Sequence, residues 1–188
     1  MPKPKSVLIV SAHWQAAPLC LSAPAAHTPI VHDFGGFHPR YHTMTYDTPD
    51  ATALAHRVAG TMPDGESLYE HPSRSLDHGA WVPLMAMYPL GDIPVLQLSL
   101  PTHDPGRLLE LGARPGPLRE EGVLVIGSGF MTHGLPFLTR GMLTKGEVPS
   151  WSSDFVTLGA APSADRAVRT TVEGFMMGFS KRSFQTAV

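Results

Sequence analysis

Three short, uninterrupted apolar runs constrain the fold of this chain more than any other feature of its sequence. They are VLIV at Val7–Val10, IPVLQLSL at Ile93–Leu100 and VLVI at Val123–Ile126. Because they do not alternate between apolar and polar residues, they predict strands buried on both faces, as in parallel sheets covered by helices. Helical patterns lie between the runs. The sequence therefore predicts an α/β fold with a mostly parallel central sheet flanked by helices.

Three helices are predicted by an aspartate placed to cap the first turn. The pairs of cap and helix are Asp50 with Ala51–Ala59, Asp77 with Gly79–Tyr88, and Asp104 with Gly106–Ala113. Near the end of the chain, Thr171–Thr186 mixes aromatic, methionine and β-favouring residues, which predicts a C-terminal strand or hairpin. No repeat or boundary interrupts the pattern, so residues 1–188 are predicted to form a single α/β domain.

Charge, hydropathy and cysteine usage narrow the kinds of partner and compartment that fit this chain. The formal net charge is −2 and the 14 basic residues are scattered, so the chain offers no basic surface for nucleic acid. No apolar stretch approaches the length of a membrane span. The single cysteine, Cys20, cannot form an internal disulfide, which fits a reducing cytoplasm. Cys20 stands between two leucines and is expected to fill space in the core.

Histidines follow the predicted strands closely. His13 comes after the first run, His103 after the second and His133 after the third. In open parallel sheets, ligands gather at the carboxyl ends of the strands. His78 stands at a predicted helix start, and His32 lies in a glycine-rich loop. Because imidazole binds iron, zinc or copper and moves protons near neutral pH, this edge is a candidate metal site. Spacing alone does not choose among the three strand-end histidines.

Two other kinds of site fit the residues less well. Gly127-Ser128-Gly129 follows a strand as a dinucleotide loop would, but position 132 is threonine where that motif has its third glycine. A histidine-dependent hydrolase would use Ser11 or Ser128, yet the GxSxG elbow is absent.

Six blocks in order along the chain resemble a known family. The blocks are VLIVSAHW, HDFGGF, LDHGAWVPLMAMYP, IPVLQLSL, LREEGVLVIGSGFMTH and GFSKRSFQ. Together they resemble the class III extradiol ring-cleavage dioxygenases of the 4,5-DOPA-dioxygenase-like (LigB-type) family. The resemblance implies a non-haem enzyme with one Fe(II) or Zn(II) per site, which opens the ring of a small catecholic substrate with O₂ as co-substrate.

The same resemblance implies roles for individual residues. His13, in SAHW, corresponds to a metal ligand. His133, in GSGFMTH, corresponds to a residue assigned either to metal contact or to acid–base catalysis, and it is the first candidate for a catalytic proton shuttle. His78, in LDHGAW, is the second candidate and is suited to hydrogen-bonding the substrate or oxygen. His32 and Asp33, in HDFGGF, correspond to a loop with a structural or pocket-lining role.

The chain also departs from the family pattern. Relatives carry a ligand histidine in a Gly-His-Gly-like turn before the SAHW strand, and another in a helix near the C-terminus. Neither segment is found here, and no histidine follows His133. The other histidines are expected on the surface: His27, His38, His42, His56 and His71.

These departures have two expected consequences. Loss of ligands should weaken metal binding, so the alternative function is a non-catalytic remnant or an aromatic-binding subunit of the same fold. Loss of a first strand would leave a sheet edge uncovered, and association into a homo-oligomer would cover it.

Overall fold

The computed structural model describes residues 3–63, 65, 67–129, 137 and 139–159. Its contacts divide the chain into two units, residues 1–129 and 130–188, and each is described by itself. The single domain expected over residues 1–188 stays a prediction. The strand or hairpin expected at Thr171–Thr186 lies outside the described residues.

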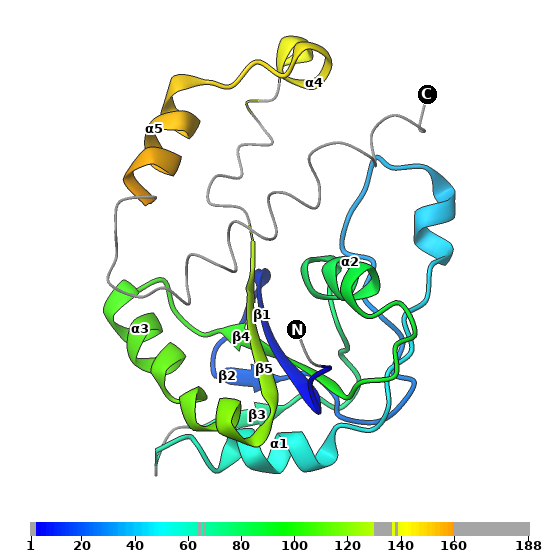
Figure 1. Cartoon of the computed structure of the whole chain (residues 1–188), viewed down its shortest axis with the longest axis vertical. Coiled ribbons are helices and arrows are strands. Elements are labelled where there is room, and N and C mark those ends of the chain that lie inside the picture. Colours follow the sequence, from blue (N-terminus) through cyan, green and yellow to red (C-terminus); the bar gives the residue numbers. More distant parts are fainter. Residues whose placement is uncertain (1–2, 64, 66, 130–136, 138, 160–188) are drawn as a thin grey trace. The chain divides into compact units, whose positions relative to one another are not determined.

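The first unit is built on a five-stranded sheet of order β3-β2-β4-β1-β5 (Figure 1). The three predicted runs form its parallel strands: β1 (Ser6–Gln15), β4 (Val95–Leu100) and β5 (Val123–Ser128). The central strand is β1, in which Val7 lies opposite Val95 on one side and Leu124 on the other. The predicted α/β fold with a mostly parallel sheet is confirmed.

Two short strands extend the sheet beyond β4. They are β2 (Leu19–Leu21), which is antiparallel to β4, and β3 (Leu68–Glu70), which is parallel to β2. Cys20 lies in β2 and is 7% exposed, and its thiol donates to the carbonyl of Pro18 at 3.1 Å. Its expected place in the core is confirmed.

The predicted helices form with ends close to those expected. They are α1 (Thr52–Ala59), α2 (His78–Met87) and α3 (Pro105–Ala113). A 3₁₀ turn, η1 (Pro39–Thr43), precedes α1, and another, η2 (Gly116–Glu121), lies between α3 and β5. Asp77 and Asp104 are the N-caps of α2 and α3, as predicted. The prediction for Asp50 was wrong by one position, because Ala51 is the N-cap of α1. Asp50 still accepts the backbone N–H of Thr52 at 3.0 Å, so it pairs one of the free N–H groups of the first turn from the position before the N-cap.

The second unit contributes α4 (Arg140–Lys145) and α5 (Ser150–Gly159). Thr139 caps α4, and the rings of Phe137 and Trp151 meet edge to face. Among the helices of the described residues, none has the length and apolar character that crossing a bilayer requires.

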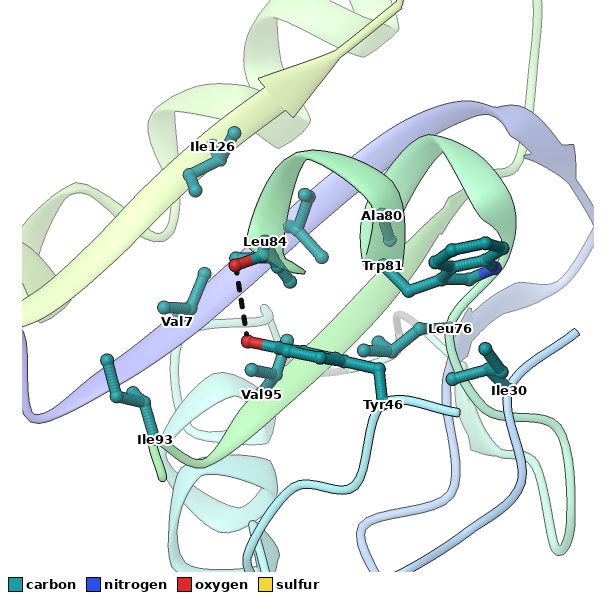
Figure 2. Close-up of a cluster of buried hydrophobic side chains, with 11 residues drawn as sticks. Val7, Ile30, Tyr46, Leu76, Ala80, Trp81, Leu84, Ile93, Val95 and Ile126 are labelled. Carbon is teal, nitrogen blue, oxygen red and sulfur yellow. Dashed lines mark hydrogen bonds between the residues drawn. The ribbon is translucent and has the colours of Figure 1, made fainter. Parts of the chain in front are cut away.

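Successive residues of β1 enter two different hydrophobic clusters, because a strand turns alternate side chains to opposite faces. Val7 and Ile9 belong to the cluster that includes Trp81 and Leu84 of α2 (Figure 2). Leu8 belongs to a second cluster with residues of β2, β4 and α1. The two faces of the sheet are thus covered by α2 and α1, and α2 is the helix that carries His78.

Tyr46, in the first cluster, makes the stability of the fold sensitive to pH in the alkaline range. Its hydroxyl donates to the carbonyl of Tyr88 at 2.9 Å. It also donates to the carbonyl of Leu84 at 3.4 Å, as Figure 2 shows. Burial, followed by the charges of Asp92 and Tyr88, raises the pKa of Tyr46 to about 12. A pKa that is raised on folding means that the stabilisation is present below the unfolded pKa near 10 and is lost as the pH rises toward 12.

Stability should therefore fall by roughly 2–3 kcal/mol between pH ~9 and ~12 through this one group. In Tyr46→Phe that part of the fall should disappear. Urea unfolding of both proteins across this pH range measures the difference. Parallel curves for the two proteins would contradict the assignment.

Candidate active site

His13 and His78 meet although they come from different elements. His13 lies near the carboxyl end of β1, and His78 is the first residue of α2, whose N-cap is Asp77. Their ring centroids are 4.0 Å apart and their planes are inclined by 40°. Both residues are partly buried. The structure thus brings together two of the three histidines proposed as site residues, at the sheet edge where ligands gather in parallel folds.

Asp33 holds His78 at two points. Its Oδ1 lies 2.7 Å from Nδ1 of the His78 ring and accepts the backbone N–H of the same residue at 3.1 Å. Burial acts to raise the pKa of Asp33, but the two hydrogen bonds and the charge attraction from His78 outweigh it and leave that pKa below its ordinary value. The residue is therefore a carboxylate at neutral pH. It also faces the positive end of the α2 dipole.

Gly79 lets the start of α2 approach β1 closely. A Cβ at this position would collide with Oγ of Ser11 and would lie 2.8 Å from Cδ2 of His13. Pro83 has no N–H to donate to the Gly79 carbonyl one turn earlier, and Oγ of Ser128 on β5 donates to that carbonyl instead, at 2.5 Å. The turn that carries His78 is thereby joined to both β1 and β5.

Both serines considered for a hydrolase bind backbone groups. Ser11 is fully buried, and its Oγ accepts the backbone N–H of His13 at 3.2 Å. Ser128 donates to the Gly79 carbonyl. Each hydroxyl thus makes a hydrogen bond to the backbone beside the histidines. A nucleophilic serine instead donates its proton to an imidazole base. The geometry of these two contacts does not favour the hydrolase.

A buried polar network fixes the start of α2 against the sheet. Asp77 is 0% exposed, and its Oδ2 accepts Nε2–H of Gln97 on β4 at 2.6 Å. In return, the backbone N–H of Asp77 donates to Oε1 of Gln97 at 2.9 Å. A guanidinium nitrogen of Arg74 lies 4.0 Å from the same Oδ2, and this guanidinium stacks over Trp14 at 4.8 Å from the ring centroid. These partners offset the cost of burying the Asp77 carboxylate, and the hydrogen bonds hold the start of α2 against β4.

Aromatic rings gather around Phe34, whose ring packs against His78. The ring of Phe34 meets His78 edge to face at 5.6 Å and lies 4.9 Å from His42 with the planes inclined by only 33°. His32 meets Trp81 edge to face at 5.9 Å, and its Nε2 lies 3.1 Å from the carbonyl of Met44. We call His32, Phe34 and His42 the aromatic wall; Trp81, which meets both His32 and Phe34, is 2% exposed and belongs to the core. Such a surface suits a flat aromatic ligand.

Sequence reasoning missed His42 as a neighbour of this site. It is exposed, as expected, but its ring packs on Phe34. His27, His38 and His56 are also exposed, whereas His71 is partly buried and its Nδ1 accepts the backbone N–H of Arg74 at 2.8 Å. No spacing rule links His42 to Phe34, and only the HDFGGF block drew attention to the loop.

Comparison with known proteins decides the family. Residues 1–158 match the family described as the catalytic LigB subunit of aromatic ring-opening dioxygenase. The chain belongs to the LigB family. The resemblance expected from its sequence blocks is therefore confirmed.

Individual relatives of this LigB-family chain carry matching names. It is 39% identical over 165 residues to a 4,5-DOPA dioxygenase extradiol of Beta vulgaris, covering 84% of this chain and 61% of that protein. It is 34% identical over 136 residues to a protein of the same name from Escherichia coli K12, covering 72% and 50%. A crystal structure of an uncharacterized Escherichia coli K12 protein has a TM-score of 0.59 at 27% identity, covering 74% of this chain and 52% of that one. The chain thus spans between half and two thirds of the length of these proteins.

The described residues of the LigB-family chain do not complete a metal site. His103 is exposed in the loop between β4 and α3, and His133 lies outside the described residues. In residues 3–129 and 137–159, as far as they are described, no group of three or more histidine, cysteine, aspartate or glutamate residues is placed to hold a metal. Oδ1 of Asp33 is already engaged with His78. A metal at His13 would need ligands from beyond these residues.

The close approach at Gly79 gives a test of the site's geometry. Gly79→Ala should lower the free energy of unfolding by about 1–3 kcal/mol and displace the His13 ring, because the new methyl group has no room. The matched control is Gly112→Ala in α3, where a Cβ meets nothing within 4 Å and alanine should stabilise by about 0.5–1 kcal/mol. Chemical denaturation measures both. Equal effects in the two variants would contradict the tight packing.

Proposed function

We propose that this LigB-family chain binds a small catecholic aromatic and opens its ring beside the hydroxyl groups, with O₂ as co-substrate. The observation that carries the proposal is the contact of His13 with His78 at the carboxyl edge of the sheet. The names of the Beta vulgaris and Escherichia coli relatives, 4,5-DOPA dioxygenase extradiol, support a catechol as the substrate class.

The described residues support two roles in this reaction. His78, held by Asp33, is positioned to accept a proton from a catechol hydroxyl and to return it later. The aromatic wall supplies ring faces and edges against which the substrate ring would pack. His133 remains the first candidate for the catalytic proton shuttle, and His78 is the second.

We propose Fe(II) or Zn(II) as the metal, with His13 and His133 among its ligands. Imidazoles suit both ions. The described residues alone do not complete a ligand set, so the roles assigned to this chain are proton transfer at His78 and packing against the substrate ring.

Reconstitution tests the activity. The chain is loaded with Fe(II) under anaerobic conditions and then given L-DOPA or catechol with O₂, and the yellow ring-opened product is followed by absorbance. The expected result is product that depends on added iron and disappears with a chelator. No product from this chain, beside an active full-length relative in the same assay, would contradict the proposal.

A second candidate function is an aromatic-binding protein of the same fold without catalysis. It is motivated by the ligand set, which the described residues alone do not complete. It predicts no stoichiometric metal, together with catechol affinity that survives chelator treatment. One tightly held iron or zinc per chain would count against it.

A homo-oligomer is a further proposal, since β5 forms one edge of the sheet within the described residues and an edge strand is a ready surface for association. Light scattering on the purified chain gives its mass. A mass equal to one chain at all concentrations would contradict the oligomer.

A further inference from the structure

We propose that Asp33 is a positioning residue that selects the tautomer of His78, by keeping the ring proton on Nδ1 and leaving Nε2 as the proton acceptor. This inference rests on the proposed function, in which His78 accepts a proton from a catecholic hydroxyl. It assigns a role to the aspartate of the HDFGGF block that goes beyond lining a pocket.

The hydrogen bonds to Asp33 define both the place and the protonated nitrogen of the ring. One oxygen, Oδ1, accepts the backbone N–H of His78 at 3.1 Å and lies 2.7 Å from Nδ1 of its ring. A neutral imidazole carries its proton on one nitrogen only, and a carboxylate can accept but not donate. The nitrogen that faces Asp33 must therefore be the protonated one, and Nε2 keeps its lone pair.

The loop that carries Asp33 is tied to the same helix that carries His78. The carbonyl of Val31 accepts Nε1–H of Trp81, in the first turns of α2, at 3.1 Å. The backbone N–H of Val31 donates to the carbonyl of Leu76 at 2.8 Å, just before the N-cap of that helix. Any shift of α2 would thus carry the Asp33 loop with it, so the Asp33–His78 pair keeps its geometry.

Neighbouring rings confine the imidazole without choosing its tautomer. Phe34 meets it edge to face at 5.6 Å, and His13 lies 4.0 Å away by ring centroids. These contacts restrict rotation of the ring, whereas the Asp33 carboxylate discriminates between its two nitrogens. A carboxylate that holds a histidine in this way fixes the tautomer in hydrolytic triads, where replacing it by an amide preserves the geometry but lowers kcat by about 10⁴-fold.

The test reads the tautomer directly and needs neither metal nor turnover. Two-bond ¹H–¹⁵N correlation spectra of the ¹⁵N-labelled full chain are recorded at a pH where His78 is neutral, and His78→Gln identifies its signals. The expected result is a proton on Nδ1 in the wild type, and a shift of the population toward Nε2–H in Asp33→Asn. The matched control, Asp104→Asn at the exposed N-cap of α3, should leave the His78 signals unchanged.

Two results would overturn the proposal: an Nε2–H tautomer in the wild type, or the same Nδ1–H tautomer in wild type and Asp33→Asn. If Asp33→Asn does not fold, Asp33→Glu keeps the carboxylate and should retain the Nδ1–H signal. In a preparation that opens catechol, Asp33→Asn should lower kcat by about 10²-fold or more with little change in KM. An Nδ1–H signal without any turnover would leave the role of Asp33 intact and count against the proposed function alone.

Discussion

Replacing His78 by glutamine is expected to lower kcat for catechol ring opening by about 10²–10⁴-fold, which is the usual contribution of a positioned general acid–base. Glutamine can occupy the first position of α2 and can still donate an amide N–H toward Asp33. It has no nitrogen that takes up a proton near neutral pH. The loss should therefore fall on the chemical step, while KM changes less. Steady-state kinetics of the iron-loaded proteins measure both constants.

The matched control is His56→Gln. His56 is an exposed histidine on α1, the helix on the opposite face of the sheet from α2, so kcat should not change. Equal activity of His78→Gln and the wild type would remove His78 from the catalytic machinery. Loss of activity in both variants would point to a general effect on folding or iron loading.

Asp77→Ala should be the most destabilising single change in the network that holds α2. We expect the free energy of unfolding to fall by about 3–5 kcal/mol, because the change removes one partner of a buried, charge-assisted set. It strips the N-cap from α2, leaves the Gln97 amide without its acceptor at 2.6 Å, and leaves Arg74 without the carboxylate at 4.0 Å. Urea unfolding with a two-state fit gives the difference.

Asp104→Ala is the matched control for Asp77→Ala. Asp104 also caps a helix, accepting the backbone N–H of Arg107 at 2.8 Å just as Asp77 accepts that of Ala80 at 3.1 Å. Asp104 is exposed, so its loss should cost only about 0.5–2 kcal/mol. Similar losses in the two variants would show that the buried partners of Asp77 add nothing beyond the cap.

The features of the fold that could be predicted are those with a local signature. Continuous apolar runs identified β1, β4 and β5, and aspartates before helical patterns identified α2 and α3 to within a residue or so. The strands β2 and β3 have three residues each, which is too short for a hydrophobic periodicity to be detected in the sequence. The place of β2 depends on pairing with β4, and that of β3 on pairing with β2, and such pairing is a tertiary property.

One signal of the buried network was present in the sequence. Gln97 interrupts the otherwise apolar run of β4 and is 0% exposed, so it had to find a polar partner inside the protein. That partner is Asp77, which the sequence identified only as a helix cap. A single sequence shows that such a partner is needed but does not identify it across 20 residues.

The candidate site shows the same limit. Strand order predicted that His13 would stand at the carboxyl edge, and the cap at Asp77 predicted that His78 would start a helix. Their contact depends on how closely α2 approaches β1 at Gly79, and the hold on His78 by Asp33 spans 45 residues of chain. Neither of these two contacts has a local signature in the sequence. The position of His133 relative to His13 stays a prediction, because His133 lies outside the described residues.

Anaerobic iron binding tests most directly whether imidazoles from separate strands converge on one ion. Bound iron is measured after desalting for the wild type, His13→Ala and His133→Ala, with His56→Ala as the control. The account predicts one Fe(II) per chain in the wild type and the control, and a loss of iron in each of the other two variants. A wild type that retains no iron, or a His133→Ala variant that retains as much as the wild type, would contradict a shared site.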